Sequence, residues 1–398
     1  MKCDSMYQNL ISHNQDLKKL RDEGYEIEIK ENHLLIHHVP YLNSNKTIKY
    51  GTLVTELSIS GDKVDKPKNH VINFTGEFPS NIDGSAILQL KHNSSTRKLS
   101  KNITINHSFS NRPKQGLNNY YEKVVHYLRI ICPPAEYFDS SATARTFKII
   151  ESQNDESVFN YVDTNSSRAE IIQVSYKLRN QKIGIIGVGG TGSYILDFIA
   201  KTPVSQIHIF DGDKFIQHNA FRAPGAASKA ILNEMPKKVD YLKGIYSNMH
   251  KHIIEHPHYV SEDNVNELEG LDFVFISVDK GEVKRQIITE IEKLKIPFID
   301  VGMGIEVVNE SLIGTLRVTT NDMKDESSVV ERNRISLSDK DDDDYKQNIQ
   351  ISELNAFNAA LAVIKWKKLL GFYIDSEQEL HSTYTINENQ LLSEDSRI

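Results

Sequence analysis

The chain has 398 residues, which favours two domains, and its 47 basic and 54 acidic residues give a net charge of −7. The acidic balance argues against a nucleic-acid partner, while 39% hydrophobic and 25% charged residues are typical of a soluble globular protein. No apolar run is long enough to cross a membrane and MKCDSMYQNL has no signal core, so we expect a cytoplasmic protein without a membrane partner. The two cysteines, Cys3 and Cys132, exclude a disulfide framework and a tetracysteine zinc site, and no zinc is expected.

Residues 1–150 are predicted to form a smaller α+β domain with antiparallel strands. A helical segment, QNLISHNQDLKKLRDEG, comes first, and alternating segments follow: YEIEIK, HLLIHHV, TLVTELSI, HVINFTGEF and NITINHSF. A second helix, YYEKVVHYLRII, is expected to stop at Pro133–Pro134. Because this region has no catalytic motif, we interpret it as a partner-recruitment domain, and the polar residues 151–167 as a connector.

Residues 168–398 have a different pattern, in which apolar runs alternate with helices. The runs are KIGII, IHIF, DFVFISV and PFIDV. Continuous apolar strands separated by helices are typical of an α/β fold, so we predict a Rossmann-like, doubly wound, mostly parallel sheet. The helix around Trp366 is predicted to pack in the core or at a dimer interface.

A glycine-rich stretch, GVGGTG at residues 187–192, follows the first of these strands and leads into a helix, SYILDFIA. Gly187 permits a tight turn, Gly189 lets the backbone approach a phosphate, and Gly192 allows the helix to pack closely on the strand. Gly190 and Thr191 then lie at a helix N-terminus, where unpaired N–H groups attract anionic oxygen. This strand, turn and helix context favours a nucleotide site over a turn without a ligand.

The next strand runs into an unusual loop, IFDGDKFIQHNAFR, at residues 209–222. Asp211 is placed to accept hydrogen bonds from ribose hydroxyls, as it would be in a NAD-dependent oxidoreductase. A dinucleotide has no use for Asn219 and Arg222, whereas an amide and a guanidinium can hold the β- and γ-phosphates of a triphosphate. The loop therefore predicts an ATP site, with the oxidoreductase as the alternative from another class. Asp213 either caps the loop or shapes a Mg²⁺ environment.

Two further segments contribute polar side chains to the same edge of the predicted sheet. MPKKVDYL begins a helix and places Lys238 near the crevice, although Lys237 is an alternative one residue away. LDFVFISVDKGEVKR ends a strand at Asp279, at the carboxyl edge where ligands bind. A carboxylate there can hold Mg²⁺, which prefers carboxylate and phosphate oxygens.

These motifs, with GMG at 302–304 and the helix ELNAFNAALAVIKWKKLLGF, resemble in order the ThiF/MoeB/ubiquitin-activating superfamily of adenylating enzymes over about residues 160–375. The whole chain looks like bacterial ThiF-family proteins with an added N-terminal domain, known from operons that encode ubiquitin-like, conjugating-enzyme-like and peptidase proteins. The resemblance implies a homodimeric, Mg²⁺- and ATP-dependent adenylyltransferase. Its substrate would be the C-terminal carboxylate of a ubiquitin-like carrier protein, which a conjugating partner then receives. Small-molecule, sulfur-carrier or tRNA-base activation is the alternative within the superfamily.

The resemblance also implies roles for individual residues. Arg222, supported by Asn219, would hold the leaving phosphates, and Lys238 would stabilise charge at the α-phosphate. Asp279 would bind Mg²⁺. Arg168 occupies the place of the arginine that family dimers lend to the partner's site, although a surface role at a helix N-terminus competes with this interpretation.

Other features are interpreted as structural. Lys284 and Arg285 are expected on a solvated helix face. The histidines of HKHIIEHPH have metal-like spacing, but no neighbouring acid or cysteine completes a ligand set, so a metal site is not favoured. Residues 321–348, expected to cross the active site, contain no cysteine, so a thioester on this protein is not expected.

Overall fold

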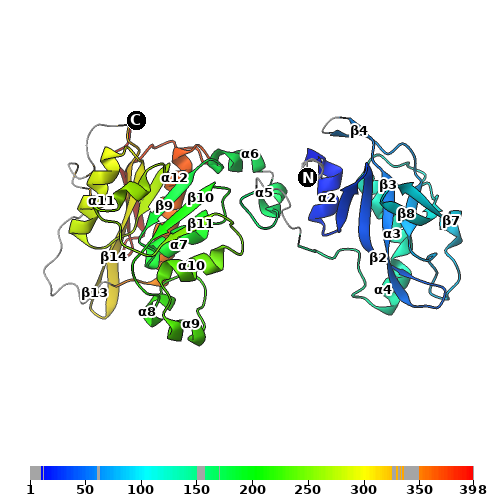
Figure 1. The fold of residues 1–398 in the computed structure, drawn as a ribbon, viewed down its shortest axis with the longest axis horizontal. Coiled ribbons are helices and arrows are strands. Elements are labelled where there is room, and N and C mark those ends of the chain that lie inside the picture. Colours follow the sequence, from blue (N-terminus) through cyan, green and yellow to red (C-terminus); the bar gives the residue numbers. More distant parts are fainter. Residues whose placement is uncertain are drawn as a thin grey trace. The chain divides into compact units, whose positions relative to one another are not determined.

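A computed structural model describes residues 10–11, 13–60, 63–149, 157–169, 171–324, 329, 332, 334–335 and 349–397, with the backbone alone at residues 60, 167 and 168 (Figure 1). The chain divides into two compact units, Met1–Asn154 and Asp155–Ile398. No helix among the described residues is both long and apolar enough to span a bilayer.

The first unit is built on a six-stranded antiparallel sheet with the strand order β1-β2-β3-β6-β8-β7. The strands are β1 Ile27–Lys30, β2 His33–Leu42, β3 Ile48–Glu56, β6 Ile72–Thr75, β7 Lys91–Ser100 and β8 Ile103–Phe109, with β4 Ile59–Ser60 and β5 Lys63–Val64 as a separate pair. The helical elements are α2 Gln15–Asp22, η1 Leu88–Leu90, α3 Tyr120–Ile131 and α4 Pro133–Phe138. The predicted α+β fold with antiparallel strands is therefore confirmed.

Helix α3 anchors the core of this unit. The Asn119 side chain caps it by accepting a hydrogen bond from the Glu122 N–H at 2.8 Å. Tyr120, Val124 and Tyr127 recur at helical spacing and are fully buried in the core that the helix shares with the sheet. The helix ends as expected before the two prolines. Pro133 then begins α4 at once, because proline suits the first helical position.

The second unit contains an eight-stranded sheet with the order β11-β10-β9-β12-β13-β14-β15-β16. Strands β11 to β13 in this order are parallel, and β14 to β16 extend the sheet antiparallel. The strands are β9 Lys182–Ile186, β10 Gln206–Phe210, β11 Ile253–His256, β12 Phe273–Ile276, β13 Phe298–Val308, β14 Ser311–Asn321, β15 His381–Thr385 and β16 Gln390–Glu394. The helical elements are α5 Thr164–Arg168, α6 Ile172–Ser175, η2 Tyr176–Leu178, α7 Gly190–Ile199, α8 Gln217–Ala220, α9 Lys229–Glu234, α10 Lys238–Tyr246, η3 Val265–Leu268, α11 Gly281–Lys293 and α12 Ser352–Leu369.

Helices cover both faces of this sheet (Figure 1). Residues of α7, α10 and α12 share one apolar core with β9 and β10, and Trp366 of α12 packs there in a T-shaped contact with Phe275. Ile287, Ile288 and Ile291 of α11 lie in a second core. The strand residues in this core alternate along the chain with those in the first core, so they face the other side of the sheet. Strands buried on both faces explain the continuous apolar runs in the sequence, and the doubly wound α/β prediction is confirmed.

Lys284 corrects one expectation about α11. Its side chain is buried, and its ammonium lies 2.9 Å from a carboxylate oxygen of Asp300, which is itself fully buried in β13. Arg317 hydrogen-bonds the other oxygen of Asp300 at 2.5 Å. The predicted solvated face is wrong for Lys284 because it shares the inward stripe with Ile287 and Ile288, whereas Arg285 remains exposed.

Candidate functional site

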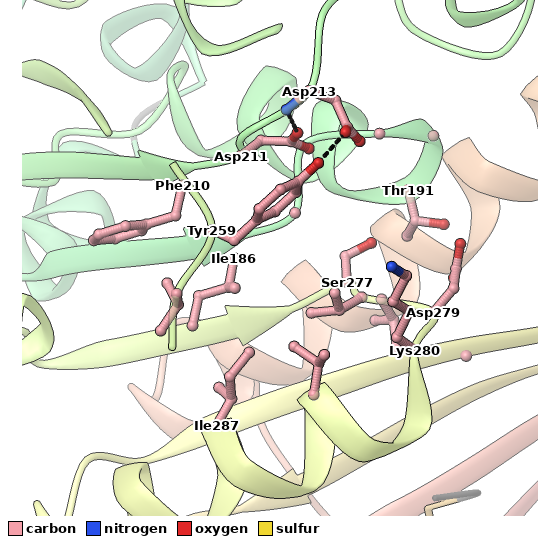
Figure 2. Close-up of a pocket in the computed structure, with 18 of the residues that line it drawn as sticks. Ile186, Thr191, Phe210, Asp211, Asp213, Tyr259, Ser277, Asp279, Lys280 and Ile287 are labelled. Carbon is pink, nitrogen blue, oxygen red and sulfur yellow. Dashed lines mark hydrogen bonds between the residues drawn. The ribbon is translucent and has the colours of Figure 1, made fainter. Parts of the chain in front are cut away.

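A cavity of about 510 Å³ opens at the carboxyl ends of β9, β10 and β12. Strand β9 lies between the other two. The chain continues from β9 to β10 and β11 on one side and then crosses to β12 on the other side, so a crevice forms where the connections diverge. Figure 2 shows Asp211 and Asp213 on one side of this space, with Thr191, Ser277, Asp279 and Lys280 on another. The predicted site residues that line it are Gly187, Gly189, Gly190, Thr191, Asp211, Asp213, Arg222, Lys238 and Asp279.

The glycine-rich turn has the geometry that its sequence predicts. Gly187 adopts a φ of 83°, and a Cβ there would lie 2.4 Å from the carbonyl oxygen of Ser277. A Cβ on Gly192 would lie 1.8 Å from the Gly187 carbonyl oxygen, so helix and turn can approach this closely only with glycine. At Gly189 a Cβ would meet nothing within 4 Å, because this residue faces the cavity. Helix α7 begins at Gly190 without a side-chain cap among the described residues, which leaves its first N–H groups for an anion.

Asp211 is fixed by the backbone around it. One carboxylate oxygen accepts a hydrogen bond from the Val188 N–H at 3.0 Å, and the other accepts one from the Asp213 N–H at 2.9 Å. The side chain is 6% exposed and lines the cavity. Each carboxylate oxygen has a further lone pair, so Asp211 can still accept hydrogen bonds from a diol such as a ribose.

Lys238 lies between two carboxylates. Its ammonium is 2.7 Å from Asp213 and 3.4 Å from Asp211, and the side chain is 8% exposed. Tyr259, which the sequence did not single out, donates a hydrogen bond to the other oxygen of Asp213. Burial raises the pKa of Asp213, but the hydrogen bonds from Lys238 and Tyr259 outweigh it and hold that pKa below its usual value. The hydrogen bond from Tyr259 to Asp213 raises the pKa of Tyr259 to about 12, so the phenol stays a donor at neutral pH.

The two lysines of PKKV have different partners. Lys238 is the first residue of α10 and lines the cavity. Lys237 precedes the helix, and its ammonium donates to the carbonyl oxygen of Gly212. Lys238 therefore lines the cavity, and Lys237 does not.

Arg222 and Asn219 carry donors that are buried but unpaired. The side-chain oxygen Oδ1 of Asn219 accepts a hydrogen bond from the Ile216 N–H at 2.9 Å, so one end of this amide caps the loop. Its Nδ2 and the Nε of Arg222 are shielded from solvent, and neither has a hydrogen-bond partner among the described residues. Buried donors without partners are costly, and a bound phosphate would satisfy them. The triphosphate predicted from the sequence therefore fits these side chains, although Asn219 itself does not line the cavity.

Asp279 follows the end of β12 and is exposed at the cavity. It accepts a hydrogen bond from Gln350 Nε2 at 3.1 Å. An exposed carboxylate beside a phosphate-binding turn is the kind of donor that Mg²⁺ takes from a protein, since this ion binds carboxylate and phosphate oxygens. The donor set therefore suits the predicted metal.

Two asparagines of α12 line the cavity, although no role was predicted for them. Asn355 is fully buried, accepts from the Thr191 hydroxyl at 2.9 Å and donates to the Arg222 carbonyl oxygen at 3.2 Å. Asn358 donates to the Gly302 carbonyl oxygen at 3.0 Å, and both line the cavity. The spacing of three residues puts both amides on one helix face, which is the signal in the sequence that could have found them.

The opposite part of the cavity is apolar. Ile186, Phe210 and Ile287 lie together on the side away from Thr191 and Asp279 in Figure 2, and Val260 and Val283 also line it. A ligand with a flat apolar ring at one end and negative charge at the other matches this division.

Several residues singled out in the sequence do not line the cavity or lie outside the described part of the chain. Arg168 ends α5, and its side chain is outside the part of the chain that the structure describes, as is Cys3. Gly192 packs under the turn instead of lining the cavity. Cys132 is buried in the core of the first unit, where burial raises the pKa of its thiol well above the usual range. The expectation that no acid accompanies the histidines was wrong, because Glu267 lies beside His256 and His258.

Two family models match this chain. Residues 167–391 match the model of the ThiF family, and residues 15–164 match a family described as a domain of unknown function, DUF6791. A curated relative, tRNA threonylcarbamoyladenosine dehydratase of Haemophilus influenzae, is 26% identical over 130 residues, which are 32% of this chain and 49% of the relative. The chain thus matches about half the length of that relative.

Solved structures to which this chain is similar include PaaA and E. coli MccB. PaaA is 16% identical with a TM-score of 0.46, and the match covers 58% of this chain and 79% of PaaA. MccB solved with ATP is 18% identical with a TM-score of 0.46, and the match covers 58% of this chain and 71% of MccB.

Proposed function

Because this chain belongs to the ThiF family of adenylating enzymes, we propose that it uses ATP to adenylate the C-terminal carboxylate of a ubiquitin-like carrier protein. The acyl group then passes to a conjugating partner. We place the reaction in the cytoplasm and in a Mg²⁺-dependent homodimer. The observation that carries the proposal is the Nε of Arg222, which is buried, has no hydrogen-bond partner among the described residues and belongs to a side chain that lines the same cavity as the glycine-rich turn. Hydride transfer to a dinucleotide does not require such a donor, and membership of the ThiF family also argues against an oxidoreductase.

The chemistry follows from where each side chain lies. A carrier carboxylate oxygen attacks the α-phosphorus of ATP, a new P–O bond forms, and the bond to the bridging oxygen breaks so that pyrophosphate leaves with the electron pair. Asp211 would hold the ribose, and the first N–H groups of α7 would hold phosphate oxygens. An ammonium has three N–H donors, so Lys238 can serve Asp211, Asp213 and an α-phosphate oxygen together. Mg²⁺, held by Asp279, would neutralise phosphate charge.

A second candidate is activation of a carboxylate on a tRNA base. The similarity to a tRNA threonylcarbamoyladenosine dehydratase favours it, while the net charge of −7 disfavours a nucleic-acid substrate. Exchange of labelled pyrophosphate into ATP separates the two. Exchange that depends on a small Gly-terminated protein supports the carrier, and exchange that depends on tRNA supports the alternative. Nucleotide binding without exchange under either condition would overturn the proposal of an adenylating activity.

The N-terminal unit is proposed to recruit partners. Because residues Asp155–Ile398 form a compact unit of their own, a chain that begins at residue 155 should still catalyse carrier-dependent pyrophosphate exchange. The same chain should fail to pass the acyl group onward. A folded, truncated chain that cannot adenylate would show that the first unit takes part in the first half-reaction.

Arg168 is proposed to complete the site of a partner subunit. Arg168→Ala and Asp279→Ala chains should each be inactive, and mixing them should restore part of the exchange activity, since a hybrid dimer has one intact site. The measurement is activity against the mixing ratio after subunit exchange is demonstrated. Without recovery, Arg168 acts within its own subunit or not at all.

The acyl group is expected to leave the adenylate without a cysteine ester. Cys132 lies buried in the first unit, and its raised thiol pKa leaves almost no thiolate at neutral pH. A Cys3→Ser/Cys132→Ala chain should therefore transfer the acyl group at the normal rate. A thiol-labile adduct on the parent chain that disappears in this variant would refute the expectation.

A further inference from the structure

A second group of ligand-type side chains lies at the end of β11, next to the segment that contributes Tyr259 to the cavity. His256 is the last residue of β11, His258 follows two residues later, and Glu267 belongs to η3. One ligand atom from each lies within 4.8 Å of the other two. We propose that His256, His258 and Glu267 bind a divalent transition metal, with zinc as the best match, and that the metal holds the segment 257–267 against the nucleotide cavity.

The distances suit a tetrahedral ion. Glu267 Oε2 lies 2.8 Å from His256 Nδ1 and 3.2 Å from His258 Nε2. Two ligands each about 2.1 Å from a tetrahedral zinc are about 3.4 Å apart, so small movements of these side chains would make room for the ion. Two imidazoles and one carboxylate, with a fourth position open to water, form a ligand set typical of zinc. Glu267 is 35% exposed, so water can reach that fourth position.

His256 is held in place by its neighbours. Its ring stacks on Phe210 with centroids 4.0 Å apart and planes 12° apart, and it also stacks on His208. The second ring nitrogen of His256, Nε2, lies 3.1 Å from Nδ1 of His208. Ligating histidines in proteins usually engage their other nitrogen in this way, which fixes the ring and leaves the first nitrogen for the metal.

His258 supplies the second, independent observation. Its Nε2 is shielded from solvent and makes no hydrogen bond with the described residues, although it lies near the Glu267 carboxylate. A buried imidazole nitrogen without a hydrogen bond is unfavourable. The Glu267 oxygen near His258, Oε2, is the same atom that lies 2.8 Å from Nδ1 of His256. A cation between the three side chains would give each of these atoms a partner.

The position of the cluster gives the metal a role in the nucleotide site. Tyr259 follows His258 directly, donates to Asp213 and lines the cavity together with Val260 and Ser261. Coordination by His258 and Glu267 would tie both ends of this segment to β11. The metal would thereby hold Tyr259 against Asp213 without itself touching the nucleotide.

The test uses Co²⁺ as a spectroscopic probe and Zn²⁺ as the competing ion, with the untagged, full-length chain freed of metal. We expect one Co²⁺ per chain, visible absorption typical of four-coordinate cobalt, and displacement by Zn²⁺. His258→Ala and Glu267→Gln should each weaken Co²⁺ binding by about 100-fold or more. Loss of a residue that only hydrogen-bonds to a metal ligand costs about 10- to 100-fold in affinity, and loss of a ligand itself should cost at least as much. His252→Ala is the matched control, because His252 directly precedes β11 but is exposed and outside the cluster.

Thermal unfolding gives a second measure that does not depend on enzyme activity. Zn²⁺ should raise the unfolding temperature of the parent chain and of His252→Ala, because an ion that binds the folded state stabilises it. It should not raise that of His258→Ala or Glu267→Gln, and both variants should fold without metal. Absence of stoichiometric Co²⁺ binding, or equal binding by all three variants, would overturn the proposal and leave an ion-paired histidine cluster.

Discussion

Arg222→Ala should lower carrier-dependent pyrophosphate exchange by about 100-fold or more, which is what loss of one preorganised donor to a developing charge costs in other enzymes. Arg222 lines the cavity and its Nε is buried without a partner among the described residues, so it is available to phosphate oxygens. Pyrophosphate exchange with saturating carrier measures the loss. Because its Nε has no hydrogen-bond partner among the described residues, removal of the side chain should leave thermal unfolding nearly unchanged.

Two variants sharpen this experiment. Arg222→Lys keeps the charge but loses the planar pair of donors, so it should retain part of the activity. Arg285→Ala removes an exposed arginine of α11 that pairs with Glu282 on the surface, and it should behave as the parent chain does. If Arg222→Ala is well folded and exchanges pyrophosphate at a near-normal rate, Arg222 does not hold the leaving phosphates.

Asp279→Asn should also reduce exchange by about two orders of magnitude, and it should raise the Mg²⁺ concentration needed for half of the remaining activity. An amide keeps the shape of the side chain but loses the charge that attracts the ion. The structure places Asp279 at the cavity, beside Gln350 and after the last residue of β12. A Mg²⁺ titration of the exchange rate measures both effects.

Asp272→Asn is the matched control for this substitution. Asp272 lies just before β12, at the opposite end of the same strand, and is exposed there. Its carboxylate accepts a hydrogen bond from the Lys182 N–H at 2.8 Å, which an asparagine can also accept. An unchanged Mg²⁺ dependence in Asp279→Asn would remove Asp279 from the metal site.

Local sequence patterns were enough to predict the parallel sheet and the glycine-rich turn. The apolar strands and GVGGTG are short contiguous segments whose geometry depends on neighbours a few residues away. Strand β7 was missed for the same reason, because KHNSSTRKLS is polar except for Leu99. It pairs with β8 at an exposed edge of the sheet through its backbone and through polar side chains, as between His92 and Ser108. No alternation of apolar residues marks such a strand.

Contacts between distant segments could not be predicted. Tyr259 and Gln350 reach the site from segments whose own sequences give no sign of it. Lys284 looks solvated until Asp300 is seen behind it, and His258 looks isolated until η3 brings Glu267 to it. In each case the partner lies on another element, so only the packing of the whole unit brings the two together.

The hydrogen bond from Thr191 to Asn355 has a consequence for protein synthesis, because it joins residues 164 positions apart. Asn355 also donates to the Arg222 carbonyl oxygen, so both the glycine-rich stretch and the Arg222 loop depend on α12. The first unit has its own core and can fold while the ribosome is still translating the second. The nucleotide site cannot be completed until α12 has left the exit tunnel. A nascent chain stalled before residue 352 should therefore display a folded first unit that binds no ATP.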